Sequence, residues 1–145
     1  MVKHLLLATL LVASAAFEAA EARTHGGPAQ PGPLANVGGA ETLHITGTEP
    51  FWGGRVRAGR LTFETPENEK SEAFRVRRTV RPRAIMFSGA MSQGAFEMVV
   101  TRKLCSDGMS DRDFPYEVTI SVGRDTLHGC GWSARRPFKE LPQGQ

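Results

Sequence analysis

The stretch Tyr116-Glu117-Val118-Thr119-Ile120-Ser121-Val122 alternates strictly between apolar and polar residues. A period of two places every second side chain on the same face of an extended chain, so that one face is apolar and the other meets water. A helix would instead repeat its apolar residues every three to four positions. This stretch therefore predicts a strand of an antiparallel sheet with one buried and one exposed face.

The same alternation, or a short apolar run, recurs between residues 43 and 130. Ala58-Gly59 is a tight hairpin signal between two of these stretches, and Gly123-Arg124-Asp125 turns the chain before the last one. A single helical turn is expected at residues 65–72, where Pro66 can open it. The further strand candidates are residues 43–46, 55–57, 61–63, 74–80, 84–87, 96–101 and 126–130.

About eight short strands joined by tight turns predict an all-β domain, either a small antiparallel barrel or a compact sandwich. We favour the barrel, because a closed sheet has no exposed strand edge. The composition agrees with a globular protein: 40% of the residues are hydrophobic and 23% are charged.

The first 22 residues have the features of a signal peptide. A short basic lead precedes an uncharged apolar run at residues 5–17, and Ala20-Glu21-Ala22 matches a cleavage site. The run is too short to span a bilayer and has no polar face. No cysteine lies at the cleavage site, so we expect no lipid anchor. The mature chain is predicted to be periplasmic or secreted.

The remaining chain divides into three parts. Residues 23–39 are rich in Gly and Pro and are expected to form a flexible leader. Residues 40–132 form the β domain, which we expect to be a monomer. Residues 133–145 are a polar tail that is expected to lie on the surface or fray.

The two cysteines, Cys105 and Cys130, are expected to form one structural disulfide in an oxidising compartment. A metal site would need more Cys or His partners, and a redox pair normally has Cys-x-x-Cys spacing. Glycines on both sides of Cys130 allow two backbones to approach closely across the bridge.

Charge gives a first indication of partners. Removing Lys3, Glu18 and Glu21 with the signal peptide leaves 17 basic and 13 acidic residues, a net charge of +4. An exported chain rarely meets nucleic acid, so anionic envelope polymers or lipid headgroups are the expected counterparts. The excess of basic residues is concentrated in Arg75, Arg77, Arg78, Arg81 and Arg83. The other interpretation of these residues is a strand whose solvent-exposed face is rich in Arg.

Two stretches carry the candidate binding residues. In Gly47-Thr48-Glu49-Pro50-Phe51-Trp52, adjacent aromatic side chains point to opposite faces of an extended chain, so Trp52 either closes the core or stacks on a ligand beside Glu49. The segment 105–116 gathers acidic and hydroxyl residues beside the disulfide. It is either a rigid structural loop, a metal loop lacking the usual terminal Glu, or a recognition loop. Its candidate residues are Asp107, Ser110, Asp111, Arg112 and Tyr116.

No nucleophile elbow, zinc-protease motif, phosphate-binding loop or dinucleotide-binding glycine pattern occurs in the sequence. We therefore expect a non-catalytic binding module without metal or cofactor, which binds an envelope protein or a small ligand. Two alternatives stay open. One is a small-ligand carrier that uses the barrel interior, and the other is a hydrolase that uses Glu49 with Asp107 or Asp111.

Taken together, several motifs resemble those of one group of uncharacterised exported proteobacterial proteins, often called predicted lipoproteins or membrane proteins. The motifs are residues 47–52, Thr65-Pro66-Glu67, residues 105–112, Phe114-Pro115-Tyr116 and Leu127-x-Gly129-Cys130. The resemblance covers residues 43–130 and implies an envelope protein without assigning an activity. Small envelope β-barrels that inhibit c-type lysozyme are a further analogy. Ser88-Gly89 here is followed by Ala90, where the inhibitors carry a Tyr.

Overall fold

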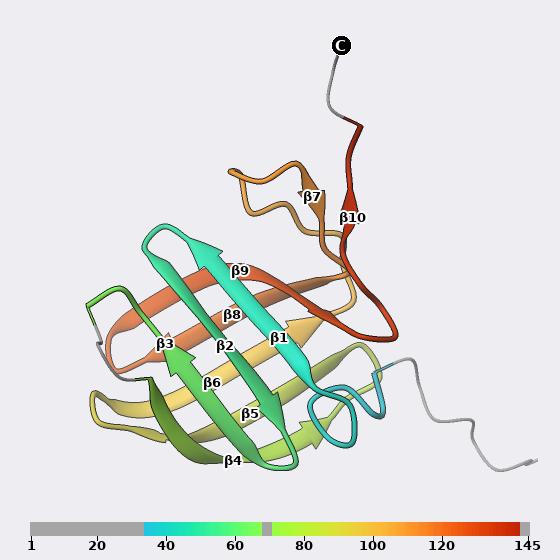
Figure 1. The fold of residues 1–145 in the computed structure, drawn as a ribbon. Helices are drawn as coiled ribbons and strands as arrows, with labels where there is room; N and C mark the ends of the chain where they lie inside the picture. The colour runs from blue at the N-terminus through green and yellow to red at the C-terminus, as the bar shows by residue number, and fades with distance from the viewer. Residues whose placement is uncertain (1–33, 68–70, 143–145) are drawn as a thin grey trace, which may run out of the picture.

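The computed structural model describes residues 34–67 and 71–142, and their main body is a closed barrel of eight antiparallel strands (Figure 1). The prediction of an all-β barrel with one disulfide is therefore confirmed. The described part of the chain contains no helix that could cross a bilayer. The barrel strands are β1 (Leu43–Thr48), β2 (Phe51–Arg57), β3 (Arg60–Glu64), β4 (Glu72–Val80), β5 (Ala84–Met91), β6 (Gly94–Thr101), β8 (Tyr116–Val122) and β9 (Asp125–Ser133).

Pairing of the first and last barrel strands closes the sheet. β1 pairs antiparallel with β9, from Leu43 opposite Ser133 to Thr46 opposite Cys130. Between them each strand pairs with the next one along the chain, except that β6 pairs with β8. The intervening segment carries β7 (Arg112–Asp113), which pairs with β10 (Lys139–Glu140) in a separate two-stranded sheet.

The inward faces of the strands fill the barrel with apolar side chains. In β8, Tyr116, Val118 and Ile120 are fully buried, while the residues between them are half-buried or exposed, as the alternation predicts. Large buried side chains from the other strands meet them in one core. They include Leu43, Ile45, Leu61, Ile85, Phe87, Phe96 and Met98.

The predicted hairpin at Ala58-Gly59 is confirmed. These two residues join β2 to β3 and have φ angles of 48° and 74°. Two successive positive φ angles give the turn whose twist matches that of the strands on either side.

The prediction of a helical turn at residues 65–72 is wrong for the part of this segment that the structure describes. Pro66 and Glu67 form a turn, and Glu72 already begins β4. The Glu72 carboxylate accepts hydrogen bonds from the backbone N–H and the hydroxyl of Ser92, at 2.7 and 2.8 Å. The segment lacks an apolar face that would bury a helix, and contacts to the β5–β6 turn fix the start of the strand instead.

The folded domain begins earlier than Ala40. Leu34 and Val37 keep only 3% and 2% of their surface exposed and belong to the core. Arg78 on β4 donates hydrogen bonds to the carbonyl oxygens of Leu34, Ala35 and Val37. This part of the predicted flexible leader is ordered because two apolar side chains and one guanidinium attach it to the barrel. The signal peptide at 1–22 and the leader up to residue 33 lie outside the described residues.

The polar tail also starts later and is more ordered than its composition predicts. Ser133 is fully buried as the last residue of β9, and the chain then makes a turn closed by backbone hydrogen bonds between Ser133 and Arg136. β10 then pairs with β7 in a two-stranded sheet that stands beyond the barrel, at the upper right of the view (Figure 1).

Candidate functional site

The predicted disulfide joins Cys105 to Cys130, with their Cα atoms 5.6 Å apart. Cys130 lies on the outer face of β9 and is nevertheless fully buried. A second tether comes from the Thr48 hydroxyl, which donates a 2.7 Å hydrogen bond to the Asp107 carbonyl oxygen. The segment after β6 is thus fixed to the barrel wall at two points.

Asp107 and Ser110 organise this segment from within. The Asp107 carboxylate accepts hydrogen bonds from the backbone N–H groups of Met109 and Ser110, at 3.1 and 2.8 Å, and from the Ser110 hydroxyl at 2.8 Å. Burial opposes its ionisation, but these bonds and the charge of Arg112 outweigh that effect and lower the Asp107 pKa. The arrangement favours the interpretation of a rigid structural loop.

Arg112 faces the C-terminal segment. Its guanidinium carbon lies 4.3 Å from the centre of the Phe138 ring, and Nη2 is 3.3 Å from a carboxylate oxygen of Glu140. Asp111 contributes its carbonyl oxygen to the Leu141 N–H and leaves its side chain exposed. The Arg112 side chain therefore contacts the C-terminal segment, whereas the Asp111 side chain is exposed.

Trp52 and Tyr116 are core residues, which corrects their expected role in binding. Trp52 points into the barrel, keeps 4% of its surface exposed and stacks on Phe63 with ring centres 5.9 Å apart. Tyr116 is fully buried. Burial raises the pKa of its phenol, and its hydroxyl has no hydrogen-bond partner among the described residues.

Glu49, Pro50 and Phe51 of the first motif lie at the surface. Glu49 is exposed in the turn between β1 and β2. Its neighbour Phe51 points outward with 53% of its surface exposed, so that Phe51 and not Trp52 is the accessible aromatic side chain. The structure thus brings Asp107 and Ser110 together and leaves the other candidate residues dispersed.

An aromatic cluster on the outside of the barrel was not predicted. Trp132 stacks on His44 at 5.2 Å and meets Phe114 at 5.5 Å and Phe138 at 5.7 Å, all measured between ring centres. These contacts form a second, smaller core under the C-terminal segment. The only sequence signal was a large aromatic residue at an outward position of β9.

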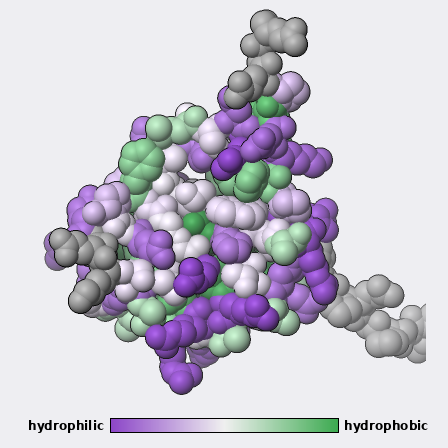
Figure 2. All heavy atoms as spheres, viewed as in Figure 1, coloured by the Kyte–Doolittle hydropathy of each residue, from purple (hydrophilic) through white to green (hydrophobic). Residues whose placement is uncertain are grey.

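Charge is distributed unequally between the two ends of the barrel. At one end, which we call the basic end, the β2–β3 and β4–β5 turns lie beside the chain that leaves β6 and β9 (Figure 1). Strongly hydrophilic residues lie on the lower and right-hand sides of the molecule in this view, and also at its upper and left-hand sides (Figure 2). The acidic residues described at this end are Glu41 and Glu117, with Asp111, Asp113 and Glu140 in the segments that carry β7 and β10. Its basic residues are more numerous: Arg57, Arg60, Arg81, Arg83, Arg102, Lys103, Arg112, Arg135, Arg136 and Lys139.

The opposite end, which we call the acidic end, carries the β1–β2, β3–β4, β5–β6 and β8–β9 connections. Arg124 is the basic residue that the structure describes there. The acidic residues are Glu49, Glu64, Glu67, Glu72 and Asp125. The barrel is therefore electrostatically polarised along its axis.

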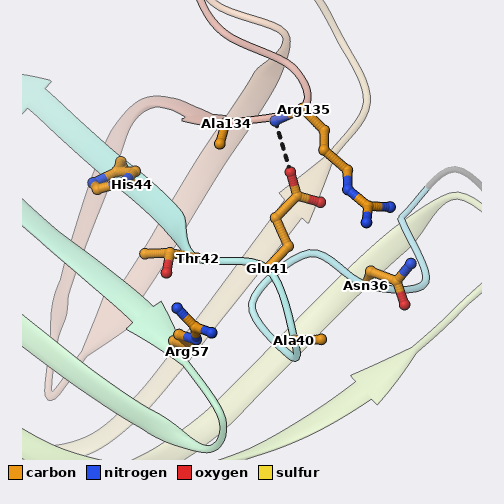
Figure 3. A pocket seen from close by; sticks show the side chains of 8 residues that line it. All are labelled: Asn36, Ala40, Glu41, Thr42, His44, Arg57, Ala134 and Arg135. Carbon is orange, nitrogen blue, oxygen red and sulfur yellow. Dashed lines mark hydrogen bonds between the residues drawn. The ribbon is translucent and has the colours of Figure 1, made fainter.

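Two surface grooves open at the basic end. The first, the Glu41 groove, has a volume of about 450 Å³. His44 and Arg57 lie to one side of Glu41 and Arg135 to the other (Figure 3). The Glu41 carboxylate accepts a 2.9 Å hydrogen bond from the Arg135 backbone N–H. The groove is lined by Asn36, Ala40, Glu41, Thr42, His44, Arg57, Ala134 and Arg135.

The second groove, the Leu104 groove, has a volume of about 470 Å³ and shares Arg135 with the first. Five basic side chains line it and no acidic one does. Its lining residues are Arg102, Lys103, Leu104, Pro115, Arg135, Arg136, Pro137 and Lys139.

Comparison of the chain with protein-family models, with curated proteins and with solved structures gives no significant match. Within residues 34–67 and 71–142, no group of three or more His, Cys, Asp or Glu side chains could hold a metal ion. The described surface offers a partner an excess of positive charge at one end of the barrel.

Proposed function

We propose that this chain is an exported, non-catalytic binding module of the cell envelope, and that the basic end of its barrel contacts an anionic partner. The observation that carries the proposal is the separation of charge between the two ends. Basic residues from four separate segments converge on one end, although they are far apart in the sequence.

Such a distribution has a physical consequence for association. A field of one sign over one end attracts and orients an anionic partner before contact, and the acidic end repels it. Exposed basic side chains are strongly hydrated, but contact with phosphate or carboxylate groups forms charge-assisted hydrogen bonds that partly compensate for lost hydration.

Export is supported by two independent features. Residues 1–22 have the pattern of a signal peptide, and the disulfide is typical of proteins that fold outside the reducing cytoplasm. N-terminal sequencing of protein from fractionated cells tests this part. A mature chain that begins at Arg23 in the extracytoplasmic fraction supports export, and an intact Met1 terminus in the cytoplasm contradicts it.

The two alternatives have less support. Apolar side chains fill the described barrel interior. A groove of about 580 Å³, lined in part by Phe63, Val122 and Leu127, opens at the acidic end and is the feature that a small-ligand carrier would use. The Asp107 carboxylate is engaged in hydrogen bonds to its own loop, and Asp111 and Glu49 are exposed side chains.

Affinity capture under oxidising conditions tests the binding function. Immobilised protein comprising residues 23–145 is exposed to an envelope extract, and retained material is compared between the wild type, an R57E/R135E variant and an R55E/R124E variant. Both double variants change the net charge equally, but Arg55 is exposed within β2 and Arg124 lies in the β8–β9 turn at the acidic end. A partner lost only with R57E/R135E supports the proposal. Equal loss with both variants indicates nonspecific charge and contradicts it.

A further inference from the structure

Leu104 is an exposed aliphatic residue within the basic end. With 68% of its surface exposed, it is the most exposed of the large hydrophobic residues in the described chain. It directly precedes Cys105, and the disulfide to Cys130 fixes this part of the chain against β9. Leu104 therefore cannot easily withdraw into the core, because its neighbour is covalently attached to the barrel wall.

The side chains around Leu104 are basic. Lys103 pairs with Glu117 at 2.7 Å, and both side chains are well exposed, so the pair is weak. The other four basic residues of the Leu104 groove form no ion pair within the described parts of the chain. They are Arg102, Arg135, Arg136 and Lys139.

One kind of partner uses both features at once. The surface of an anionic bilayer presents phosphate groups at the level of the basic side chains and hydrocarbon directly beneath them. A polyanion such as polyphosphate or nucleic acid would engage the charges alone and leave Leu104 in water. The acidic end, being repelled, would turn the barrel so that the Leu104 groove faces the lipid.

We propose that the Leu104 groove docks the barrel on an anionic lipid bilayer, with Leu104 inserted between headgroups and the surrounding arginine and lysine side chains on lipid phosphates. This inference rests on the proposed function, since it names the anionic partner of the basic end.

Vesicle sedimentation tests the inference with the oxidised protein of residues 23–145. Vesicles of equal parts phosphatidylglycerol and phosphatidylcholine are compared with vesicles of phosphatidylcholine alone. We expect binding to the anionic vesicles only. Leu104→Ser should lower the partition coefficient about tenfold, the loss expected for one aliphatic side chain transferred back to water. R102E/K139E should lower it at least as much.

Matched controls separate the site from general charge and hydrophobicity. R55E/R124E makes the same charge change on β2 and at the acidic end, and Phe51→Ser removes an exposed apolar side chain at the acidic end. Both should bind anionic vesicles nearly as well as the wild type. If the two groups of variants lose binding equally, the proposed site is wrong.

A polyphosphate binding assay distinguishes failure of this inference from failure of the proposed function. If Leu104→Ser leaves vesicle binding unchanged, and R102E/K139E weakens polyphosphate and vesicle binding alike, the bilayer assignment is overturned while an anion-binding basic end stands. If the wild type binds neither vesicles nor polyphosphate and captures no envelope component, both proposals fail.

Discussion

The indole ring of Trp52 lies against the backbone of Gly47, its register partner across the β1–β2 hairpin. On the neighbouring strand β9, Gly129 faces the same ring. The absence of a Cβ atom at both glycines lets the large ring pack directly against the barrel wall. The packing of Trp52 against these two glycines explains the motifs at residues 47–52 and 127–130 as packing features and not as ligand contacts.

A methyl group at Gly47 should therefore destabilise the fold. The Cβ atom of Gly47→Ala would collide with the indole ring, and we expect a loss of about 1–3 kcal/mol in the free energy of unfolding, as for other overpacked cores. Gly53→Ala on the facing strand is the control, since its Cβ would have only the Ile45 carbonyl oxygen nearby, at 3.7 Å. Urea denaturation of both variants tests the prediction, and equal stabilities would contradict it.

Arg78 should anchor the residues that precede β1. Arg78→Met removes the guanidinium that binds three carbonyl oxygens and leaves those oxygens without their donors, so we expect a loss of about 1–3 kcal/mol. Hydrogen exchange at Val37 and Gly38 should also become faster. The neighbouring Arg77→Met changes an exposed side chain and should alter neither quantity. If hydrogen exchange at Val37 and Gly38 is unchanged in Arg78→Met, the apolar contacts of Leu34 and Val37 hold this segment on the barrel without the guanidinium.

Loss of the disulfide should weaken the whole domain. Replacing both cysteines by serine removes a cross-link between residues 25 positions apart, which corresponds to about 3–4 kcal/mol in the chain-entropy model. Denaturation of the double variant, compared with the oxidised wild type, measures the difference. Reduced wild-type protein should behave like the double variant, and a reduced protein as stable as the oxidised one would contradict the prediction.

The lowered pKa of Asp107 predicts how stability depends on pH. The carboxylate stabilises the fold in its charged form, so its contribution is present above its ordinary pKa of 3.8 and is lost as the pH falls through the lower folded-state pKa. Asp107→Asn should lower stability at pH 7 by about 0.5–1 kcal/mol, because the group is partly exposed, and the difference from the wild type should shrink in acid.

Asp111→Asn is the control for this pH dependence. Its carboxylate is exposed, and the structure records only a backbone bond at this residue. Urea denaturation at pH 7 and pH 3 should show no difference between this variant and the wild type at either pH. A gap for Asp107→Asn that stays constant with pH would contradict the role given to its charge.

Local features of the sequence determined the barrel strands and the disulfide. Period-two alternation is a property of neighbouring residues, and residues 116–122 show it so regularly that only their register remained to be found. The Ala58-Gly59 hairpin is equally local, because two positive φ angles require particular residues at those positions. The pairing of Cys105 with Cys130 needed only their count and an oxidising compartment.

Only the tertiary structure decided which side of the wall each candidate residue occupies and which distant residues meet. The sequence could place Trp52 in the core or at a ligand, and the space left by Gly47 and Gly129 settled it. Leu34 and Val37 join the core through contacts to β4 and other strands distant in sequence. The basic end gathers segments from Arg57 to Lys139. These residues are close in space because the barrel closes, and closure fixes the spatial order of the turns. The local sequence around each residue does not reveal this order.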